Sequence, residues 1–141
     1  MTSHFRIIAW ENNTLLMQAG LNTNDLIPLN LYCCVNHGLY SPSGETRTWL
    51  DIELEKRGTR VISATTSTFH SLAKIDTHSD LLATVPERTA NDMAMHYPLT
   101  DYRHPLEGIK SDLMMAWHYR NDKKPEQAWF RSIVIDERAK L

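Results

Sequence analysis

The chain has 141 residues, of which 15 are basic and 17 acidic, so its formal net charge is −2. Hydrophobic residues make up 42% and charged residues 23%, proportions that are typical of a globular domain and exclude a disordered or membrane-spanning chain. Basic residues form no long cluster of the kind that binds nucleic acid by itself, and the short patch at Arg120, Lys123 and Lys124 is interpreted as a solvated helix entrance.

No segment is long and apolar enough to span a membrane, and the first residues lack the apolar core of a secretory signal. The two cysteines, Cys33 and Cys34, are neighbours in sequence and are poorly placed for a disulfide with each other. They are expected to be small buried side chains in a reducing compartment. We therefore expect a cytoplasmic protein.

The first part of the chain contains two expected strands separated by a loop. Residues 5–10 are rich in β-forming side chains and end at a turn, whereas residues 21–28 are expected to be mainly loop. Residues 37–40 form the second expected strand. It ends in the turn 41–44, because the proline and glycine of this turn cannot continue a strand.

A helix is expected next, because apolar side chains repeat at helical spacing from Thr46 onward and Gly58 supplies a left-handed stop. Residues 59–65 then alternate polar and apolar side chains, as a strand does. The cluster at residues 66–68 consists of N-cap formers and predicts that a second helix begins at about Phe69.

The second half of the chain continues this alternation. Residues 80–85 are a compact apolar run typical of a buried strand, and Pro86 suits the first turn of a following helix. Two further strands, at residues 99–103 and 112–118, and a final helix opened by Pro125 complete the chain. The alternation of strands and helices predicts an α/β fold with a mainly parallel sheet.

The sequence offers no catalytic or metal-binding motif. The seven histidines show neither the spacing of a helical zinc site nor a cysteine partner at CxxC spacing, so no metal is expected. The turn 41–44 lacks the glycine-flanked serine of a hydrolase, and its proline removes an amide that an oxyanion hole would need. There is no glycine-rich phosphate-binding loop, so no cofactor is expected.

Two polar junctions remain, and each lies where an expected strand is followed by an expected helix. They span residues 41–46 and 65–68. Free amides and the positive end of a helix dipole meet at such junctions, and ligands of open α/β sheets bind beyond the carboxyl ends of the strands. The same residue types are equally typical of helix caps, so both interpretations stay open.

Several short motifs, each present once, follow one another along the chain. They are the strand at residues 5–10, HGLYSPSG at 37–44, SDLLATVPER at 79–88, Trp117-His118, and Trp129 with Arg131. Each motif alone is weak, and the set is specific. In this order they resemble the substrate-binding domain of LysR-type transcriptional regulators.

The resemblance implies a type 2 periplasmic-binding-protein-like fold, in which two α/β subdomains joined by crossing strands enclose a ligand. Residues 5–85 would form the complete second subdomain, with crossover strands near residues 5–10 and 81–85. Residues 86–141 would be the returning segment of the first subdomain. Without earlier strands of that subdomain, this segment would bury its apolar residues on one side only, so we expect association or local disorder there.

The resemblance also implies that the chain is the effector-sensing part of a transcription regulator and has no enzymatic activity. The effector would be a small organic molecule, with aromatic acids as the indicated class. The residues carried over as effector-facing are Ser41, Ser43, Thr65, Thr66 and Thr68. The winged helix-turn-helix of the family is expected to be absent, so DNA would be reached only through a domain outside this chain. Another copy, or a full-length regulator, is the expected protein partner.

Two other functions remain open. One is an interaction module that pairs with full-length regulators without binding a ligand. The other is a small α/β hydrolase that uses Ser41 or Ser43 with one of the histidines.

Overall fold

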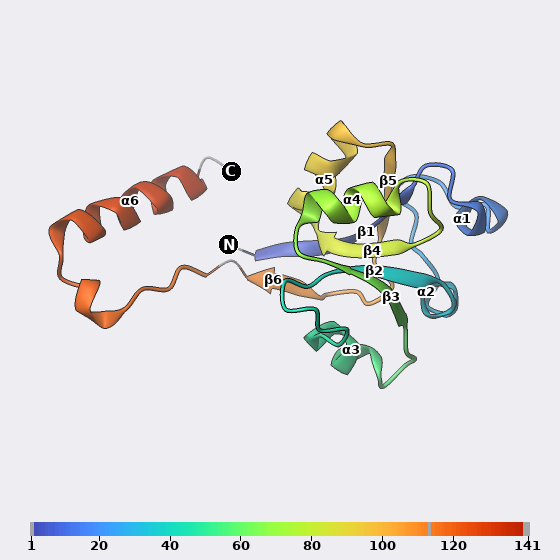
Figure 1. Ribbon diagram of the computed structural model, residues 1–141, viewed down its shortest axis with the longest axis horizontal. Helices are drawn as coiled ribbons and strands as arrows, with labels where there is room; N and C mark the ends of the chain where they lie inside the picture. Colours follow the sequence, from blue (N-terminus) through green and yellow to red (C-terminus); the bar gives the residue numbers. More distant parts are fainter. Residues whose placement is uncertain (1, 113, 140–141) are drawn as a thin grey trace. The chain divides into compact units, whose positions relative to one another are not determined.

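The structure is a computed structural model that describes residues 2–112 and 114–139. The chain divides into a large unit of residues 3–111 and a small unit of residues 1–2 and 112–141. In chain order, the elements before the small unit are β1 (Thr2–Trp10), α1 (Thr14–Gln18), α2 (Leu29–Cys34), β2 (Asn36–Tyr40), α3 (Trp49–Leu54), β3 (Val61–Thr66), α4 (Phe69–Asp76), β4 (Leu82–Pro86), α5 (Glu87–His96), β5 (Leu99–Arg103) and β6 (Lys110–Asp112), as Figure 1 shows. The small unit carries the 3-10 turn η1 (Tyr119–Asn121) and α6 (Pro125–Ala139).

The strands of the large unit form one sheet with the order β3-β2-β4-β1-β5, and β6 also pairs with β1. Strand β2 runs parallel to both β3 and β4, whereas β1 runs antiparallel to both β4 and β5. The predicted α/β fold is confirmed, but the sheet is mixed rather than mainly parallel. Side-chain pattern reports which face of a strand is buried and not the direction in which the strand runs, so the sequence could not reveal this.

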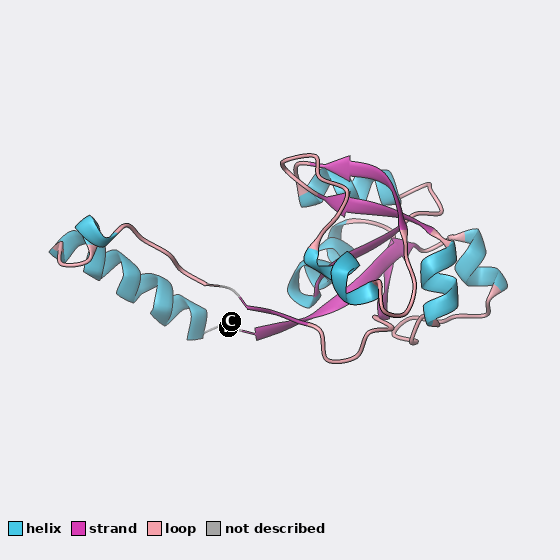
Figure 2. Ribbon diagram, turned by 90° about the horizontal axis from the view of Figure 1, so that it is seen from below, coloured by secondary structure: helices cyan, strands magenta, loops and turns pink. Residues whose placement is uncertain are grey.

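Helices lie on both faces of the sheet (Figure 2). Because successive side chains of a strand point to opposite faces, the central strands supply two apolar cores. Ile7 and Leu82 belong to the core that is shared with α1, α2 and α3. Ile8 and Ala83 belong to the core that is shared with α4 and α5.

Several helices differ from their predicted bounds. The helix predicted from Thr46 is the shorter α3, and the short helices α1 and α2 lie on either side of the predicted loop at residues 21–28. Gly58 is not among the glycines with positive φ in the described chain, so the predicted left-handed stop is wrong. Glycine is required there for space instead, because a Cβ at Gly58 would lie 2.7 Å from Sγ of Cys33. Cys34 is exposed rather than buried.

Helix α4 begins where the sequence predicts. The Thr68 side chain accepts a hydrogen bond from the Ser71 amide and caps the helix, as expected of an N-cap residue. The helix packs closely on β2 at Gly38, where a Cβ would lie 2.8 Å from Cδ1 of Leu72 and 3.0 Å from Oδ1 of Asp76. This close approach holds the middle and the end of α4 against the middle of β2.

The division of the chain does not coincide with the predicted boundary at Pro86. Helix α5 and strand β5 pack on the same sheet as the preceding elements, so the large unit extends to Ser111. The predicted crossover at residues 81–85 is β4, which lies in the middle of the sheet between β2 and β1. The assignment of either unit to a regulator subdomain stays a prediction.

The small unit is held by local polar contacts and has no buried core among residues 114–138. The Arg131 guanidinium lies 4.5 Å from the Trp117 ring centre and donates to the Asp122 carbonyl at 2.8 Å. Trp117 Nε1 donates to the Asp122 carboxylate at 3.0 Å. The motif residues Trp117 and Arg131 therefore contact each other. The predicted strand 112–118 includes Leu113, which lies outside the described residues, and residues 114–118 are irregular.

Candidate ligand-binding site

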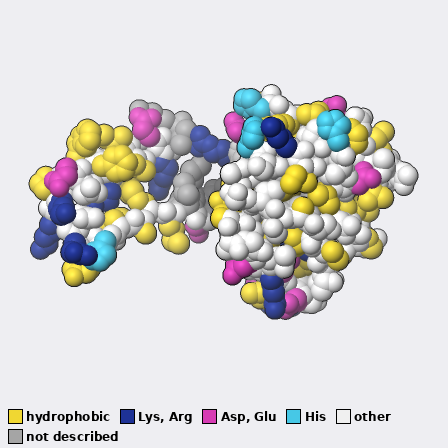
Figure 3. Space-filling model, in the orientation of Figure 1, with side chains coloured by type: hydrophobic (Ala, Val, Ile, Leu, Met, Phe, Trp, Pro, Cys, Tyr) yellow, Lys and Arg dark blue, Asp and Glu magenta, His cyan; other side chains and the backbone are white. Residues whose placement is uncertain are grey.

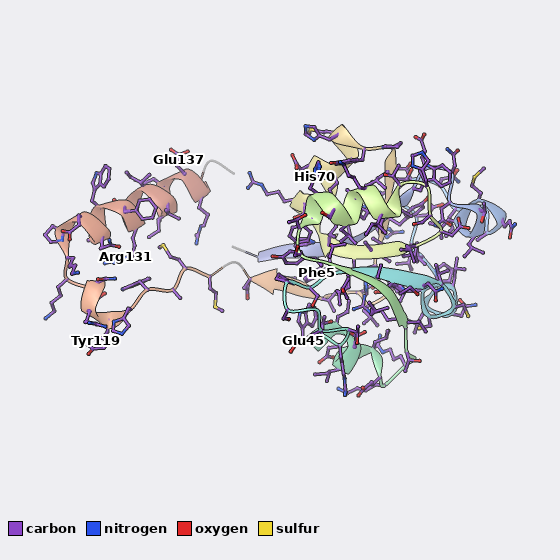
Figure 4. All side chains as sticks on the ribbon, in the orientation of Figure 1. Phe5, Glu45, His70, Tyr119, Arg131 and Glu137 are labelled. Carbon is purple, nitrogen blue, oxygen red and sulfur yellow. The ribbon has the colours of Figure 1, made fainter. Side chains whose placement is uncertain are left out.

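The two predicted polar junctions lie side by side at the carboxyl edge of β2 and β3. These strands are parallel neighbours, with Tyr40 opposite Thr66. The Ser41 amide donates to the Thr66 carbonyl at 2.8 Å, which extends the pairing by one step past β2. Phe5, Glu45 and His70, which come from β1, the 41–48 loop and α4, all lie at this end of the sheet (Figure 4). The prediction that two strand exits come together is consistent with this geometry.

Two of the five predicted hydroxyls, those of Thr66 and Thr68, make hydrogen bonds within the chain. Thr66 is buried, and its Oγ1 donates to the Thr68 carbonyl at 3.0 Å. Thr68 Oγ1 accepts from the Ser71 amide at 3.1 Å and donates to the Ser71 hydroxyl at 2.9 Å. For Thr66 and Thr68, the helix-cap interpretation therefore accounts for the residue type, although each oxygen can accept at least one further hydrogen bond.

The other three hydroxyls make no hydrogen bond with any part of the chain that the structure describes. Ser41 is half-buried, whereas Ser43 and Thr65 are exposed. Ser43 lies in the turn closed by the hydrogen bond from the Gly44 amide to the Ser41 carbonyl at 3.0 Å. Thr65 and Thr66 are consecutive in β3 and so point to opposite faces of the sheet. Of the predicted set, Ser41, Ser43 and Thr65 are the hydroxyls left available to a ligand.

An aromatic pair that the sequence analysis did not single out lies beside these hydroxyls. The ring of Tyr40, the last residue of β2, stacks on the ring of Phe69, the first residue of α4, with centroids 4.1 Å apart and planes at 20°. Tyr40 remains 38% exposed, so part of its surface is open to solvent. The positions of Tyr40 beside Ser41 and of Phe69 beside Thr68 are the only sequence signals for this pair.

A second aromatic pair lies at the same edge on the opposite face. Phe5 near the start of β1 contacts Trp49 at the start of α3, with ring centroids 5.3 Å apart. Trp49 is 48% exposed. Aromatic surface is therefore available on both faces of the strand ends.

A buried ion pair fixes the helix that follows the first junction. Arg60, whose side chain is 1% exposed, donates to both carboxylate oxygens of Asp51, at 2.7 and 3.2 Å. Asp51 in turn accepts from the amide and hydroxyl of Thr48 in the capping box of α3. Burial opposes ionisation of Asp51, but the hydrogen bonds from Arg60 and Thr48 outweigh it and lower the pKa of the carboxyl. The pair therefore holds the start of α3, and with it one end of the 41–48 loop.

The same network reaches the centre of the sheet through Tyr32. Its hydroxyl contacts Arg60 at 3.1 Å and Thr84 at 2.8 Å. The rings of His37 and His104 pack edge-on against the Tyr32 ring, with centroid distances of 4.4 and 4.9 Å. Burial lowers the pKa of each histidine to about 4, so both are neutral at pH 7 and act as core side chains.

The geometry gives no support to the hydrolase interpretation. Within the described chain, the histidine hydrogen bonds that are resolved go to groups other than Ser41 and Ser43. No group of three or more metal-ligating side chains is found among the described residues. No described helix has both the length and the apolar character needed to cross a bilayer.

Comparison with known proteins shows which proteins this chain is similar to. No family model matches the sequence. Over 115 residues the chain is 26% identical to the HTH-type transcriptional activator NahR of Pseudomonas putida, a match that covers 81% of this chain and 38% of that protein. The regulatory domain of MexT, a transcriptional activator in Pseudomonas aeruginosa, is 26% identical and superposes with a TM-score of 0.76 over 94% of this chain and 60% of that one.

The homologues of this chain are LysR-type transcriptional regulators. The resemblance predicted from the motifs is therefore confirmed. The BenM effector-binding domain, solved with its effector benzoate, superposes with a TM-score of 0.53 over 94% of this chain and 61% of that chain. Its 9% identity shows a common fold alone. The fold is the type 2 periplasmic-binding-protein-like fold of LysR regulatory domains, and the chain spans about two fifths of its curated LysR-type relative.

Proposed function

We propose that this chain is the effector-sensing part of a LysR-type transcriptional regulator and binds a small organic molecule at the carboxyl edge of β2 and β3. The observation that carries the proposal is the juxtaposition of the two polar junctions, joined by the hydrogen bond from Ser41 to Thr66. Amides and hydroxyls at strand ends are suited to a polar or anionic group. In a whole regulator, occupancy of this edge would be read out by a DNA-binding domain, and its effect is limited by the difference in affinity between the two states.

The ligand class that this edge fits is an aromatic carboxylate. Ser41 and Ser43 offer hydroxyls for a carboxylate, and the exposed part of Tyr40 offers a flat apolar surface. Thr65 lies on the opposite face of the sheet from Tyr40 and is left out of this arrangement. Benzoate, the effector of the fold neighbour BenM, belongs to this class. In the proposed arrangement, the carboxylate bonds the hydroxyls and the ring packs against the stack of Tyr40 on Phe69.

We further propose that the large unit is the second effector-binding subdomain and that residues 112–141 return to the first. The supporting observation is that the two units are joined at two places in the chain, at the start of β1 and the end of β6. These two strands pair with each other. The proposed crossover strands are therefore β1 and β6. The sequence predicted crossovers at residues 5–10 and 81–85, of which only the first, β1, is kept.

Calorimetric titration with benzoate tests the ligand proposal. We expect saturable binding of benzoate and weaker binding of cyclohexanecarboxylate, which has the same charge and a puckered ring. Ser41→Ala should weaken benzoate binding by about 1 kcal/mol, the usual contribution of one hydrogen bond. Ser63→Ala, which removes an exposed serine of β3 away from the strand end, is the matched control. Equal effects of the two substitutions, or no binding of either acid, would contradict the proposal.

A pure interaction module remains the second candidate, because α6 exposes a large apolar surface. Its exposed apolar residues are Trp129, Phe130, Ile133, Val134 and Ile135. Figure 3 shows hydrophobic side chains gathered on this part of the surface. Such a surface is typical of a contact with another protein. If the chain co-elutes with a full-length relative during size-exclusion chromatography and binds no small acid, this second function is favoured.

A further inference from the structure

A separate cavity lies within the large unit, where the chain leaves the sheet between β5 and β6. Strand β5 ends at Arg103 and β6 begins at Lys110, and the intervening loop covers a cavity of about 300 Å³. One wall of the cavity is apolar. Its apolar residues are Phe5, Leu26, Leu106 and Ile109. The volume is at the lower end of the range for sites that bind small molecules.

The same cavity is lined by charges of both signs that do not pair with one another. Arg103, Glu87 and Glu107 all line it, yet no ion pair within 4.0 Å joins any two of them in the described chain. Arg103 donates through Nε to the Asn24 carbonyl at 3.2 Å, which holds the side chain and leaves its terminal N–H groups without a partner among the described residues.

The neighbouring Arg6 differs from Arg103 because its charge is already paired. Arg6 also lines the cavity, but it donates to the Asp101 carboxylate and to the Asn24 side chain. Arg6 is therefore neutralised, and the unpaired charges are one guanidinium and two carboxylates. Opposite charges that face one cavity without pairing are suited to a ligand that carries both charges.

We propose that this cavity binds an α-amino acid with an apolar side chain. The ligand carboxylate would bond the terminal N–H groups of Arg103, because a guanidinium offers two parallel donors to a carboxylate. The ligand ammonium would face Glu87 or Glu107. The ligand side chain would pack against the apolar wall at Leu26 and Leu106. A simple carboxylate would meet two uncompensated glutamates, and a simple amine would leave Arg103 without a partner.

This proposal does not depend on the effector function of the β2–β3 edge, because the residues proposed to contact the ligand, Arg103, Glu87, Glu107, Leu26 and Leu106, are not among those proposed to bind a ligand at that edge. Aliphatic probes keep the two sites distinguishable, since the strand-end proposal requires an aromatic ring. The three probes are L-leucine, isopentylamine, which lacks its carboxylate, and 4-methylpentanoate, which lacks its amine. We expect calorimetry on the full chain to show saturable binding of L-leucine, with each truncated analogue bound about tenfold more weakly or worse.

Two substitutions locate the charges that carry this preference. Arg103→Gln should weaken L-leucine binding by about tenfold and leave isopentylamine unaffected, whereas Glu87→Gln combined with Glu107→Gln should leave 4-methylpentanoate unaffected or improved while weakening L-leucine. Arg103 and Glu107 are exposed and Glu87 is half-buried, and circular dichroism tests whether the variants fold. Arg57→Gln removes an exposed arginine outside the cavity and is the matched control. The proposal is overturned if L-leucine does not bind, if it binds no better than both analogues, or if Arg57→Gln has the same effect as Arg103→Gln.

Discussion

The ionisable side chains of His37, Asp76 and His104 are buried in the large unit. His37 and His104 are buried and neutral, and each has one ring nitrogen with no hydrogen-bond partner in the described chain. Asp76 is fully buried, and neither of its carboxylate oxygens has a partner there. Burial raises the pKa of Asp76 to about 8 and lowers that of each histidine to about 4. These groups therefore titrate at different pH in the folded and unfolded chains.

We predict a maximum of stability near pH 6.5. As the pH falls from 8 to 6.5, folded Asp76 takes up a proton that the unfolded carboxyl does not. The unfolded histidines begin to bind protons in the same range, so stability rises by only roughly 0.5–1 kcal/mol per pH unit. Below pH 6.5 the two histidines take up protons in the unfolded chain only. Their combined loss, about 2.7 kcal/mol per pH unit, exceeds the gain from Asp76 and reverses the slope. Urea unfolding between pH 5 and pH 8 measures this profile, and a flat profile would contradict the assignment.

Asp76→Asn separates the contribution of Asp76 to the pH profile from that of the two histidines. The substitution removes the cost of keeping a buried carboxyl protonated, so we expect the chain to gain up to about 4 kcal/mol at pH 7. The alkaline slope should disappear, while the acid slope should approximately double because the histidines are no longer opposed. If Asp76→Asn destabilises the chain at pH 7, the carboxylate has a stabilising partner that the described residues do not provide.

The Arg60–Asp51 pair gives a direct contrast between buried and exposed ion pairs. Arg60→Gln leaves Asp51 without its partner, and we expect the free energy of unfolding to fall by about 3 kcal/mol. Arg47→Gln removes the exposed contact with Glu55 and should cost less than about 1 kcal/mol. Because Arg60 holds the start of α3, amide hydrogen exchange should quicken in the 41–48 loop in the first variant alone. Equal losses in both variants would show that the buried pair has no special role.

At the scale of elements, the packing of α4 on β2 decides how the proposed ligand-binding edge is built. Thr68 caps the helix, and Gly38 lets it approach the sheet, so that Phe69 reaches Tyr40. The cap at residues 66–68 could be predicted because it is local in sequence. The stack of Tyr40 on Phe69 could not, because it depends on the parallel register of β2 and β3 and joins residues that are 29 positions apart in the chain.

The same distinction between local and long-range signals explains which of the other sequence predictions agree with the structure. Strong runs such as residues 80–85 identified strands within a few residues of their bounds. Helices α1 and α2 have five and six residues, which is too short for a helical repeat to stand out. The direction of β1 and the closeness of Ser41 to Thr66 arise from sheet topology. Residue type alone left ligand-facing and helix-capping threonines indistinguishable, and only the hydrogen bonds of Thr66 and Thr68 separate them from Ser41.

Gly38→Ala tests the close packing of α4. The added methyl group would lie 2.8 Å from Cδ1 of Leu72 and 3.0 Å from Oδ1 of Asp76, so α4 must shift or the side chains must move. We expect a loss of about 1–3 kcal/mol in the free energy of unfolding and weaker benzoate binding, since Phe69 moves with the helix. Gly20→Ala is a poor control because Gly20 has φ +70°, whereas Ala19→Gly changes an exposed helix end away from the site. A Gly38→Ala variant as stable as the parent would contradict this packing.

At the scale of the whole molecule, the large unit has two apolar cores whereas the small unit has none in its described part. Trp129 and Phe130 are 66% and 57% exposed. A 15-residue helix with this much open apolar surface gains little stability by itself, because most helical stability in proteins comes from packing. The surface of α6 is therefore expected to contact another protein surface, as the sequence analysis anticipated for residues 86–141.

We predict concentration-dependent association of the chain through α6. Phe130→Gln with Val134→Gln removes two apolar side chains one helical turn apart, and it should shift the chain toward the monomer in sedimentation velocity. Met95→Gln, which removes an apolar side chain that is 79% exposed on α5, is the matched control. A chain that stays monomeric at every concentration would contradict association through this face.

The central claim is that the ends of β2 and β3 form one ligand-binding surface. Titration of the isotope-labelled chain with benzoate, followed by amide NMR, tests it most directly. We predict saturable shifts that share one dissociation constant in both segments, residues 41–44 and 65–69. Shifts in only one of the two segments, or saturable shifts confined to other parts of the chain, would contradict it.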